Sequence, residues 1–188
     1  MCNTACLEWV ASVISEAEIK GATILESGAF DVNGSARSLF EQYKPKLYIG
    51  TDIKPGRGVD QICAAEDLFL MYGRAFDVVL STEVIEHVRD WRAVIDNYKR
   101  VLRPFGLLII TTRSLGFPYH EHPEDHWRYE LSDMPLIFKD FEIVNLNTDE
   151  SAPGVFIKAR KPKGWKAADL SKIALYKVVA GQEVERSL

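Results

Sequence analysis

Residues 24–35 read ILESGAFDVNGS, residues 47–53 read LYIGTDI, and residues 76–88 read FDVVLSTEVIEHV. Each stretch contains a short apolar run that ends at or near a carboxylate, namely Glu26, Asp52 and Glu83. Such runs are typical of strands that are buried on both faces of a parallel sheet. Because the carboxyl ends of parallel strands border one ligand-binding crevice, we expect these acids to lie close together. An acidic crevice suits a ligand with hydroxyl groups and positive charge.

Helical patterns alternate with these runs. Apolar residues at helical spacing predict a first helix over residues 5–19, which Gly21 ends, and a second helix that carries Leu39 and Phe40. Ser35 or Asn33 is the candidate N-cap of the second helix. A third stripe runs from Trp91 to Leu102, while VDQICAA and LLIITT are further candidate strands. Alternating strands and helices predict a doubly wound α/β fold with helices on both faces of the sheet.

The last third of the chain has a different pattern. The loop SLGFPYHEHPEDHWRY precedes a short predicted helix over residues 132–138 and two strands, FEIVNLN and GVFIKAR. A Pro-Gly turn joins these strands, so we expect them to be antiparallel. Residues 164–188 show weak helical periodicity and are expected to frame the domain or to mediate association. We therefore predict one domain over residues 1–188, with its core in residues 22–160.

The charge balance argues against a general affinity for nucleic acid or for anionic membranes. The 188 residues have a net charge of −4. The C-terminal part is nevertheless basic, with seven Lys and Arg residues from Lys158 to Lys177 and only Asp169 to oppose them. We interpret this segment as a solvated basic tail, with a contact surface for substrate or nucleic acid as the alternative.

The sequence also bears on the cellular compartment. No apolar run approaches the roughly 20 residues of a membrane span, and the N-terminal stretch lacks the pattern of a signal peptide. Cys2, Cys6 and Cys63 cannot all pair with one another, which favours a reducing environment. We therefore expect a cytoplasmic protein without a membrane partner.

Five motifs occur in an order that resembles a known family. The series ILESG, GTD, AEDL, FDVVLSTEVIEHV and RVLRPFGLLIITT resembles the class I S-adenosylmethionine-dependent methyltransferases that act on small molecules. The resemblance extends over about residues 22–160. It implies a Rossmann-like sheet of seven strands, mostly parallel with an antiparallel last strand, and S-adenosylmethionine as the cofactor.

The chemistry of S-adenosylmethionine assigns roles to the strand-end residues. Glu26 is placed to stabilise the cationic methionine end, and Gly28 lets the backbone approach the ligand. Asp52 follows Gly28 by 24 residues, close to the offset at which an acid accepts hydrogen bonds from ribose hydroxyls. Ile53, just after Asp52, is expected to pack on the adenine, and the resemblance implies that Glu66 and Asp67, with the backbone around Ala65, border the adenine pocket. The predicted cofactor-binding set also includes Ala29, Phe30 and Ser81.

Two parts of the sequence, the loop after the first strand and the end of the third strand, depart from the pattern of the family. Phe30 and Val32 occupy places where glycines are usual, and Ala64 replaces a common acid after the third strand. A nicotinamide dinucleotide needs a close backbone approach to its pyrophosphate, so the bulky loop argues against that ligand. S-adenosylmethionine has no phosphate and tolerates such a loop.

The methyl acceptor is expected to meet the histidine-rich loop. Methyl transfer is an in-line displacement, and a hydroxyl acceptor also needs a base near its proton. His120, His122 and His126 are the candidates for that base. Asp125 and Arg128 are expected to fix the loop, and Trp127 to anchor it in the core.

Glu83, Glu86 and His87 form a Glu-x-x-Glu-His string with two possible roles. The string resembles the divalent-metal site of ubiquinone-pathway and small-RNA O-methyltransferases, but we interpret it as shaping the cofactor loop and predict no metal. We expect methyl transfer to a hydroxyl, or less readily an amine, of a small molecule or sugar by a monomer or homodimer. The alternatives are an RNA or metal-assisted O-methyltransferase and a methyltransferase-like binding module without activity.

Overall fold

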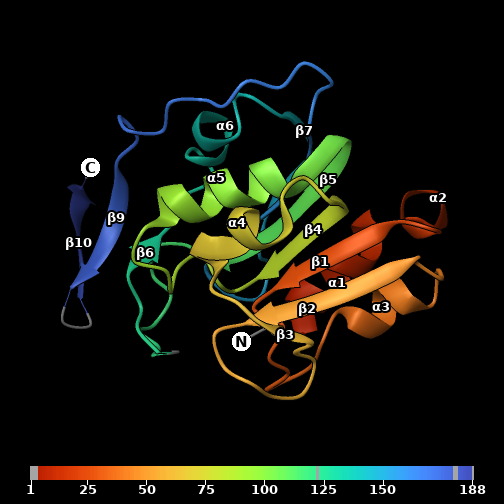
Figure 1. Cartoon of the computed structure of the whole chain (residues 1–188). Coiled ribbons are helices and arrows are strands. Elements are labelled where there is room, and N and C mark those ends of the chain that lie inside the picture. Colours follow the sequence, from red (N-terminus) through yellow and green to blue (C-terminus); the bar gives the residue numbers. More distant parts are fainter. Residues whose placement is uncertain (1–3, 122, 180–181, 188) are drawn as a thin grey trace.

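The computed structural model describes residues 4–121, 123–179 and 182–187. Its core is a seven-stranded sheet in the order β3-β2-β1-β4-β5-β8-β7 (Figure 1). Strands β1 to β5 pair in parallel, whereas β8 is antiparallel to both β5 and β7. The predicted fold, a mostly parallel sheet whose last strand is antiparallel, is thus confirmed. The strands are β1 (Thr23–Ser27), β2 (Leu47–Asp52), β3 (Gln61–Ile62), β4 (Phe76–Thr82), β5 (Leu102–Arg113), β7 (Glu142–Thr148) and β8 (Gly154–Arg160).

Helices cover both faces because successive strand residues point to opposite sides of the sheet. In β1, Ile24 packs in the apolar cluster shared with α1 and α3, while Leu25 packs in the cluster shared with α5 and α6. Figure 1 shows α4, α5 and α6 on one face, with α1 and α3 on the other. The helices are α1 (Thr4–Val13), α2 (Glu16–Ile19), α3 (Arg37–Glu41), α4 (Leu68–Tyr72), α5 (Trp91–Val101) and α6 (Met134–Ile137). None of the helices in the described ranges is long and apolar enough to cross a membrane.

Local structure differs from the predictions at two places in the first half of the chain. The single helix expected over residues 5–19 is divided into α1 and α2, because Ser15 starts a new helix in a capping box with Glu18. The third strand is only Gln61–Ile62, and a short 3-10 turn at Ala65–Asp67 and the unpredicted α4 follow it. Five residues are too few to show a clear helical period in the sequence.

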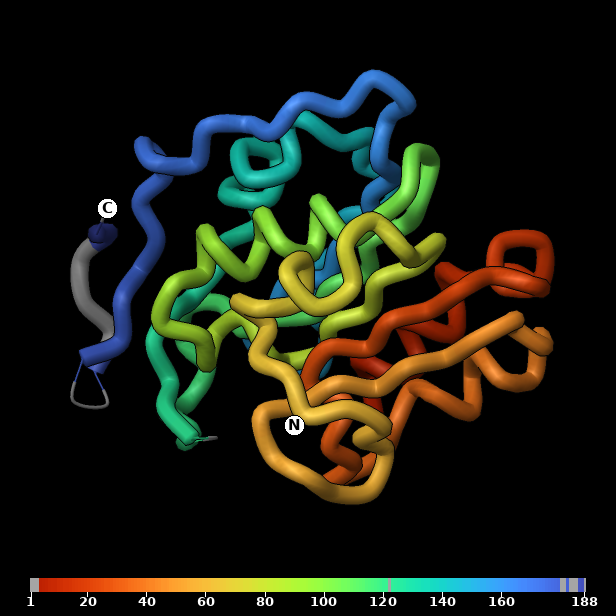
Figure 2. The backbone as a smooth tube through the Cα atoms, in the orientation of Figure 1, coloured from red at the N-terminus to blue at the C-terminus, as the bar shows by residue number. Residues whose placement is uncertain are grey.

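The helical structure suggested by the weak periodicity of residues 164–188 is wrong. This segment contains β9 (Leu175–Val179) and β10 (Gln182–Ser187), which form a second sheet with β6 (Trp127–Arg128) in the order β10-β9-β6. In Figure 2 the chain after β8 crosses the side of the molecule that carries α6 and then ends within the second sheet. The C-terminal segment therefore lies along the edge of the domain, which is one of the two places expected for it.

Two of the cations in the basic stretch are structural rather than solvated. The Lys158 ammonium is buried and lies 2.7 Å from Glu18 Oε1. Lys161, also buried, donates to the carbonyl oxygens of Lys99 and Leu102 at 2.6 and 2.8 Å. A cation at the end of a helix neutralises its free carbonyls, so Lys161 stabilises the C-terminus of α5.

Asp140 joins the C-terminal segment to α5. Its carboxylate accepts from the buried Lys99 ammonium at 2.6 Å, and also from Trp165 Nε1 and the backbone N–H of Ala168. Lys99 also donates to the carbonyl oxygen of Ile137. The carboxylate is thus the charge that balances Lys99 inside the protein.

Asp140→Ala is expected to lower the free energy of unfolding by about 3–5 kcal/mol, because it leaves a buried ammonium without its counter-ion. Urea unfolding followed by circular dichroism measures this loss. The control is Asp96→Ala, which breaks the half-exposed pair with Arg100 and is expected to cost less than about 1 kcal/mol. Equal effects of the two substitutions would contradict the role of Asp140.

Candidate active site

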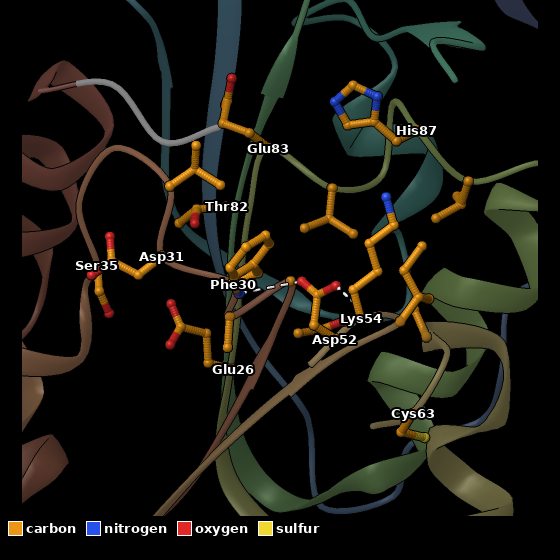
Figure 3. A pocket seen from close by; sticks show the side chains of 18 of the residues that line it. Glu26, Phe30, Asp31, Ser35, Asp52, Lys54, Cys63, Thr82, Glu83 and His87 are labelled. Carbon is orange, nitrogen blue, oxygen red and sulfur yellow. Dashed lines mark hydrogen bonds between the residues drawn. The ribbon is translucent and has the colours of Figure 1, made fainter. Parts of the chain in front are cut away.

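A cavity of about 560 Å³ lies at the carboxyl ends of β1, β2 and β4 (Figure 3). The sequence predicted that Glu26, Asp52 and Glu83 would lie together, and all three line this cavity. Most of the predicted cofactor-binding residues also line it: Glu26, Gly28, Ala29, Phe30, Asp52, Ile53, Ala65 and Glu66.

Among the predicted cofactor contacts, Asp67 and Ser81 do not line the cavity. The side chain of Ser81 is fully buried on β4, where its hydroxyl lies 3.1 Å from the Tyr98 hydroxyl. Tyr98 in turn donates to Ser27 Oγ at 2.9 Å. Ser81 therefore belongs to a hydrogen-bonded group between β4 and α5 and is absent from the cavity wall.

Asp52 is held in place by backbone groups on both sides. Its two carboxylate oxygens accept from the N–H of Phe30 at 3.2 Å and the N–H of Lys54 at 3.1 Å. Each oxygen keeps a second lone pair, so the carboxylate can still accept hydrogen bonds from a ligand. Figure 3 shows Asp52 near the centre of the cavity, between Phe30 and Lys54. This geometry suits the two hydroxyls of a ribose.

Glu26 is a buried acid in the same wall. Its side chain is 3% exposed, and Glu26 Oε2 accepts from the Tyr48 hydroxyl at 2.9 Å. Burial raises the pKa of Glu26 to about 7, although the Tyr48 hydrogen bond and the nearby Arg37 guanidinium both oppose that rise. A cation bound in the cavity would favour the ionised carboxylate.

Glu83 faces away from the other two acids, although it lines the cavity. It has a positive φ of 57°, which is unusual for a residue with a side chain. Its carboxylate forms an ion pair with the buried guanidinium of Arg113, which also contacts Asp149 Oδ2 at 2.9 Å. In Figure 3 the Glu83 side chain points away from Asp52. Glu83 thus shares its cation with Asp149 inside the protein.

The glycines missing from the cofactor loop have counterparts in the loop that faces it. A Cβ on Gly56 would lie 2.2 Å from the Phe30 ring, and one on Gly58 would lie 2.4 Å from the Ala29 carbonyl oxygen. The backbone N–H of Asp31 donates to the Arg57 carbonyl oxygen across the same contact. The bulky Phe30 is therefore accommodated by the neighbouring loop. Gly28 stays essential, since its φ is +80° and a Cβ would lie 2.1 Å from Val84.

Among the described histidines, the cavity wall contains only His87, which the sequence did not predict to be catalytic. Its Nδ1 lies 2.6 Å from the Glu124 carbonyl oxygen, so this nitrogen carries the proton and Nε2 has the lone pair. Burial lowers the pKa of His87 and favours the neutral imidazole. Its position just after β4 is the sequence feature that indicates a site residue, although the three histidines of the loop were the predicted bases.

The three histidines that were predicted to be catalytic differ in their surroundings, and the structure describes two of them. His120 packs edge-on against His87, with ring centroids 4.6 Å apart, and its Nδ1 lies 3.0 Å from Asp125 Oδ2. His126 Nε2 lies 3.0 Å from Glu124 Oε2, and His126 is not part of the cavity wall. His122 lies outside the described residues.

Asp125 and Arg128 fix the loop, as expected. The buried Arg128 guanidinium holds both oxygens of Asp125, at 2.5 and 2.7 Å. The ion pair with Arg128 and the hydrogen bonds from His120 hold the pKa of Asp125 well below its ordinary value, despite burial. Trp127 is buried and donates to the Val88 carbonyl oxygen, so it anchors the loop in the core.

Glu86, His87 and His120 form a cluster beside the cavity. One ligand atom from each residue lies within 4.8 Å of the others, which is close enough to hold a metal ion. Glu86 is fully buried; its Oε2 accepts from Thr112, while its Oε1 has no hydrogen-bond partner among the described residues. That oxygen lies 3.8 Å from His87 Nε2. Glu83, by contrast, is turned towards Arg113 and does not join the cluster.

Sequence comparisons give two matches. A family model described as a methyltransferase domain matches residues 7–147. The ubiquinone biosynthesis O-methyltransferase of Parvibaculum lavamentivorans is 42% identical over 80 residues, which are 43% of this chain and 32% of that protein. The match therefore spans about a third of the curated relative.

Solved structures with the same fold include two methyltransferases. The 1,6-didemethyltoxoflavin-N1-methyltransferase of Burkholderia thailandensis, with bound 1,6-didemethyltoxoflavin and S-adenosylhomocysteine, has a TM-score of 0.68 at 15% identity, covering 85% of this chain and 80% of that one. An S-adenosylmethionine-dependent methyltransferase of Mesorhizobium loti has a TM-score of 0.58 at 16% identity, covering 82% and 98%. With three quarters of its length matched by the family model, the chain belongs to the methyltransferase domain family of S-adenosylmethionine-dependent enzymes.

Proposed function

We propose that the protein transfers the methyl group of S-adenosylmethionine to a hydroxyl group of a small molecule. The observation that carries this proposal is the cavity itself. Its wall combines a ribose-type carboxylate, Asp52, with a buried acid for a cationic group, Glu26, and a histidine, His87. The partial match to an O-methyltransferase supports oxygen as the acceptor atom.

The cofactor would lie with its parts along the cavity wall. Asp52 accepts from the ribose hydroxyls, and the half-exposed Ile53 packs on the adenine. Glu26 accepts from the ammonium group of the methionine part, where Gly28 lets the backbone come close. In this arrangement, Thr82 and His87 at the β4 end of the cavity would lie near the sulfonium.

The reaction needs alignment and one proton transfer. The acceptor oxygen attacks the methyl carbon in line with the carbon–sulfur bond, so the sulfonium becomes a neutral thioether. The hydroxyl proton passes to His87 Nε2, the nitrogen that does not donate to Glu124. Glu86 stabilises the resulting imidazolium, since its Oε1 lies 3.8 Å away. His120, oriented by Asp125, packs against His87 and keeps its ring in place.

A second candidate is a metal-assisted version of the same transfer. It is favoured by Glu86 Oε1, a buried carboxylate oxygen that has no hydrogen-bond partner among the described residues. Glu86, His87 and His120 would hold a divalent cation, and their mixed oxygen and nitrogen donors fit such an ion. A bound cation would polarise the acceptor oxygen and make its proton easier to lose.

We place the protein in the cytoplasm. Cys6 and Cys63 are buried thiols, which fits a reducing compartment. The buried positions of Lys158 and Lys161 remove two cations from the surface that RNA would contact, so a small molecule is the preferred acceptor over RNA.

Asp52→Ala is expected to weaken the binding of S-adenosylhomocysteine by roughly 10²-fold, because two hydrogen bonds to a charged carboxylate are lost. The rise in melting temperature on adding the ligand should disappear with it. Isothermal calorimetry and thermal unfolding measure the two effects. Asp96→Ala, which changes an acid outside the cavity, serves as the control. Unchanged ligand binding in Asp52→Ala would remove the ribose assignment.

His87→Ala is expected to lower kcat by about 10²–10⁴-fold, the usual contribution of a positioned base, while the Kd of S-adenosylhomocysteine stays within about threefold. The assay follows radiolabelled methyl transfer to a panel of dihydroxybenzoates, free sugars and primary amines. His126→Ala is the matched control, because that imidazole lies outside the cavity wall. A normal kcat for His87→Ala would exclude His87 as the base.

The metal-assisted candidate has its own measurement. Titration of Mn²⁺ into metal-free protein should release heat with a stoichiometry of about one, and Glu86→Gln should abolish the heat because the ion loses its carboxylate ligand. Glu66→Gln, an acid at the adenine end of the cavity, is the control. The absence of heat in the unaltered protein would leave direct proton transfer to His87 as the route.

A further inference from the structure

Glu26 on β1 and Tyr48 on β2 lie on neighbouring strands, and the pairing of these strands fixes their relative positions. In the parallel pairing of β1 and β2, Glu26 lies beside Gly50 and Ile24 lies beside Tyr48. Glu26 lies two residues beyond Ile24 on the same face of the sheet, so its carboxylate is within reach of the Tyr48 hydroxyl on the neighbouring strand. That hydroxyl donates to Glu26 Oε2 at 2.9 Å. Tyr48 itself is absent from the cavity wall, where Glu26 is present.

We propose that Tyr48 is a positioning residue for the cofactor, because its hydroxyl holds the Glu26 carboxylate in place to accept from the ammonium group of the methionine part. This inference rests on the proposed function, since it assumes that S-adenosylmethionine binds in the cavity. It goes beyond that function by assigning a role to a residue that does not touch the ligand.

The ring of Tyr48 is rigidly packed, so its hydroxyl has a defined position. Phe40 meets the ring edge-on at 5.9 Å between centroids, and the Arg37 guanidinium lies 4.7 Å above its face. Arg37 is also bound to the loop after β2, through the Asp60 carboxylate and the Gly58 carbonyl oxygen. Both of these bonds use Arg37 Nη2, and the Tyr48 hydroxyl is the direct donor to Glu26.

The charged groups around Glu26 come from several elements. Arg37 of α3 favours the ionised carboxylate, whereas Asp31 and Asp60, in the loops after β1 and β2, disfavour it. Glu26 itself is 3% exposed, so water contributes little to its solvation. Under these conditions one neutral donor has a large effect, because a hydrogen bond to a carboxylate stabilises its charged form.

A dependence of cofactor binding on pH follows from this arrangement. Burial raises the pKa of Glu26 to about 7. Below that pH the carboxyl group is protonated and cannot balance an ammonium, so the affinity for the cofactor falls as the pH drops. Loss of the Tyr48 hydroxyl raises the pKa of Glu26 further and moves this fall to a higher pH. A purely structural defect would instead weaken binding equally at every pH.

The test is the Kd of S-adenosylhomocysteine against pH in Tyr48→Phe, which keeps the ring and removes only the hydroxyl. We expect the midpoint to move up by about one pH unit, so that binding is about tenfold weaker at pH 6 and within about twofold of normal at pH 8.5. Tyr43→Phe, in the same apolar layer, is the control. In a Glu26→Gln background the Tyr48→Phe change should have no further effect on the profile.

The outcomes separate this inference from the proposed function. Absence of S-adenosylhomocysteine binding to the unaltered protein at every pH overturns both. Binding with the same pH midpoint in the unaltered protein and in Tyr48→Phe overturns only the role of Tyr48. A second measurement needs no variant: binding to the unaltered protein at pH 6.5 should release a proton, seen as a heat that depends on the buffer. Binding without proton release would also overturn the inference.

Discussion

Three buried carboxylates at one edge of the sheet set the conditions for the whole site. Glu26, Glu83 and Glu86 are 3%, 4% and 0% exposed, and an uncompensated buried charge costs several kcal/mol. Glu83 forms an ion pair with Arg113, which also pairs with Asp149. Glu26, in the cavity wall, accepts from Tyr48, and Glu86, beside the cavity, accepts from Thr112. In the proposed function, Glu26 accepts from the ammonium of the cofactor, and Glu86 stabilises the His87 imidazole that takes the acceptor proton.

The same edge shows how one loop can compensate for another. A cofactor loop with Phe30 in place of a glycine would crowd its neighbour if that neighbour carried side chains. Gly56 and Gly58 remove this conflict, and the N–H of Phe30 still donates to Asp52. Arg37 then ties the second loop to α3. The space around the cofactor loop thus depends on the residues of both loops. A motif that considers the glycines of only one loop leaves out the residues that face it.

The sequence was informative where local pattern and burial agree. Continuous apolar runs predicted β1, β2, β4 and β5, and the acids at their ends led to the cavity. It failed where long-range pairing decides the structure. β9 pairs with β6, more than 40 residues earlier, and β10 pairs with β9, whereas their own sequence has a weak helical period. Glu83 could not be separated from Glu26 by sequence, because its turn towards Arg113 depends on a partner 30 residues away. His87 was undervalued for the same reason, since its contact with Glu124 comes from folding of the distant loop.

The histidine-rich loop beside the cavity is supported by a segment that lies outside the family match. The family match ends at residue 147, yet the loop that carries His120 is supported from beyond that point. The N–H of Val178 on β9 donates to the His126 carbonyl oxygen, and Arg186 on β10 forms an ion pair with the buried Asp133 at 2.5 Å. A segment outside the matched residues thus supports the loop that carries His120 and His126. The cavity wall, including His87, lies wholly within residues 7–147. The strands that support the loop therefore lie beyond the family match, whereas the residues that form the cavity lie inside it.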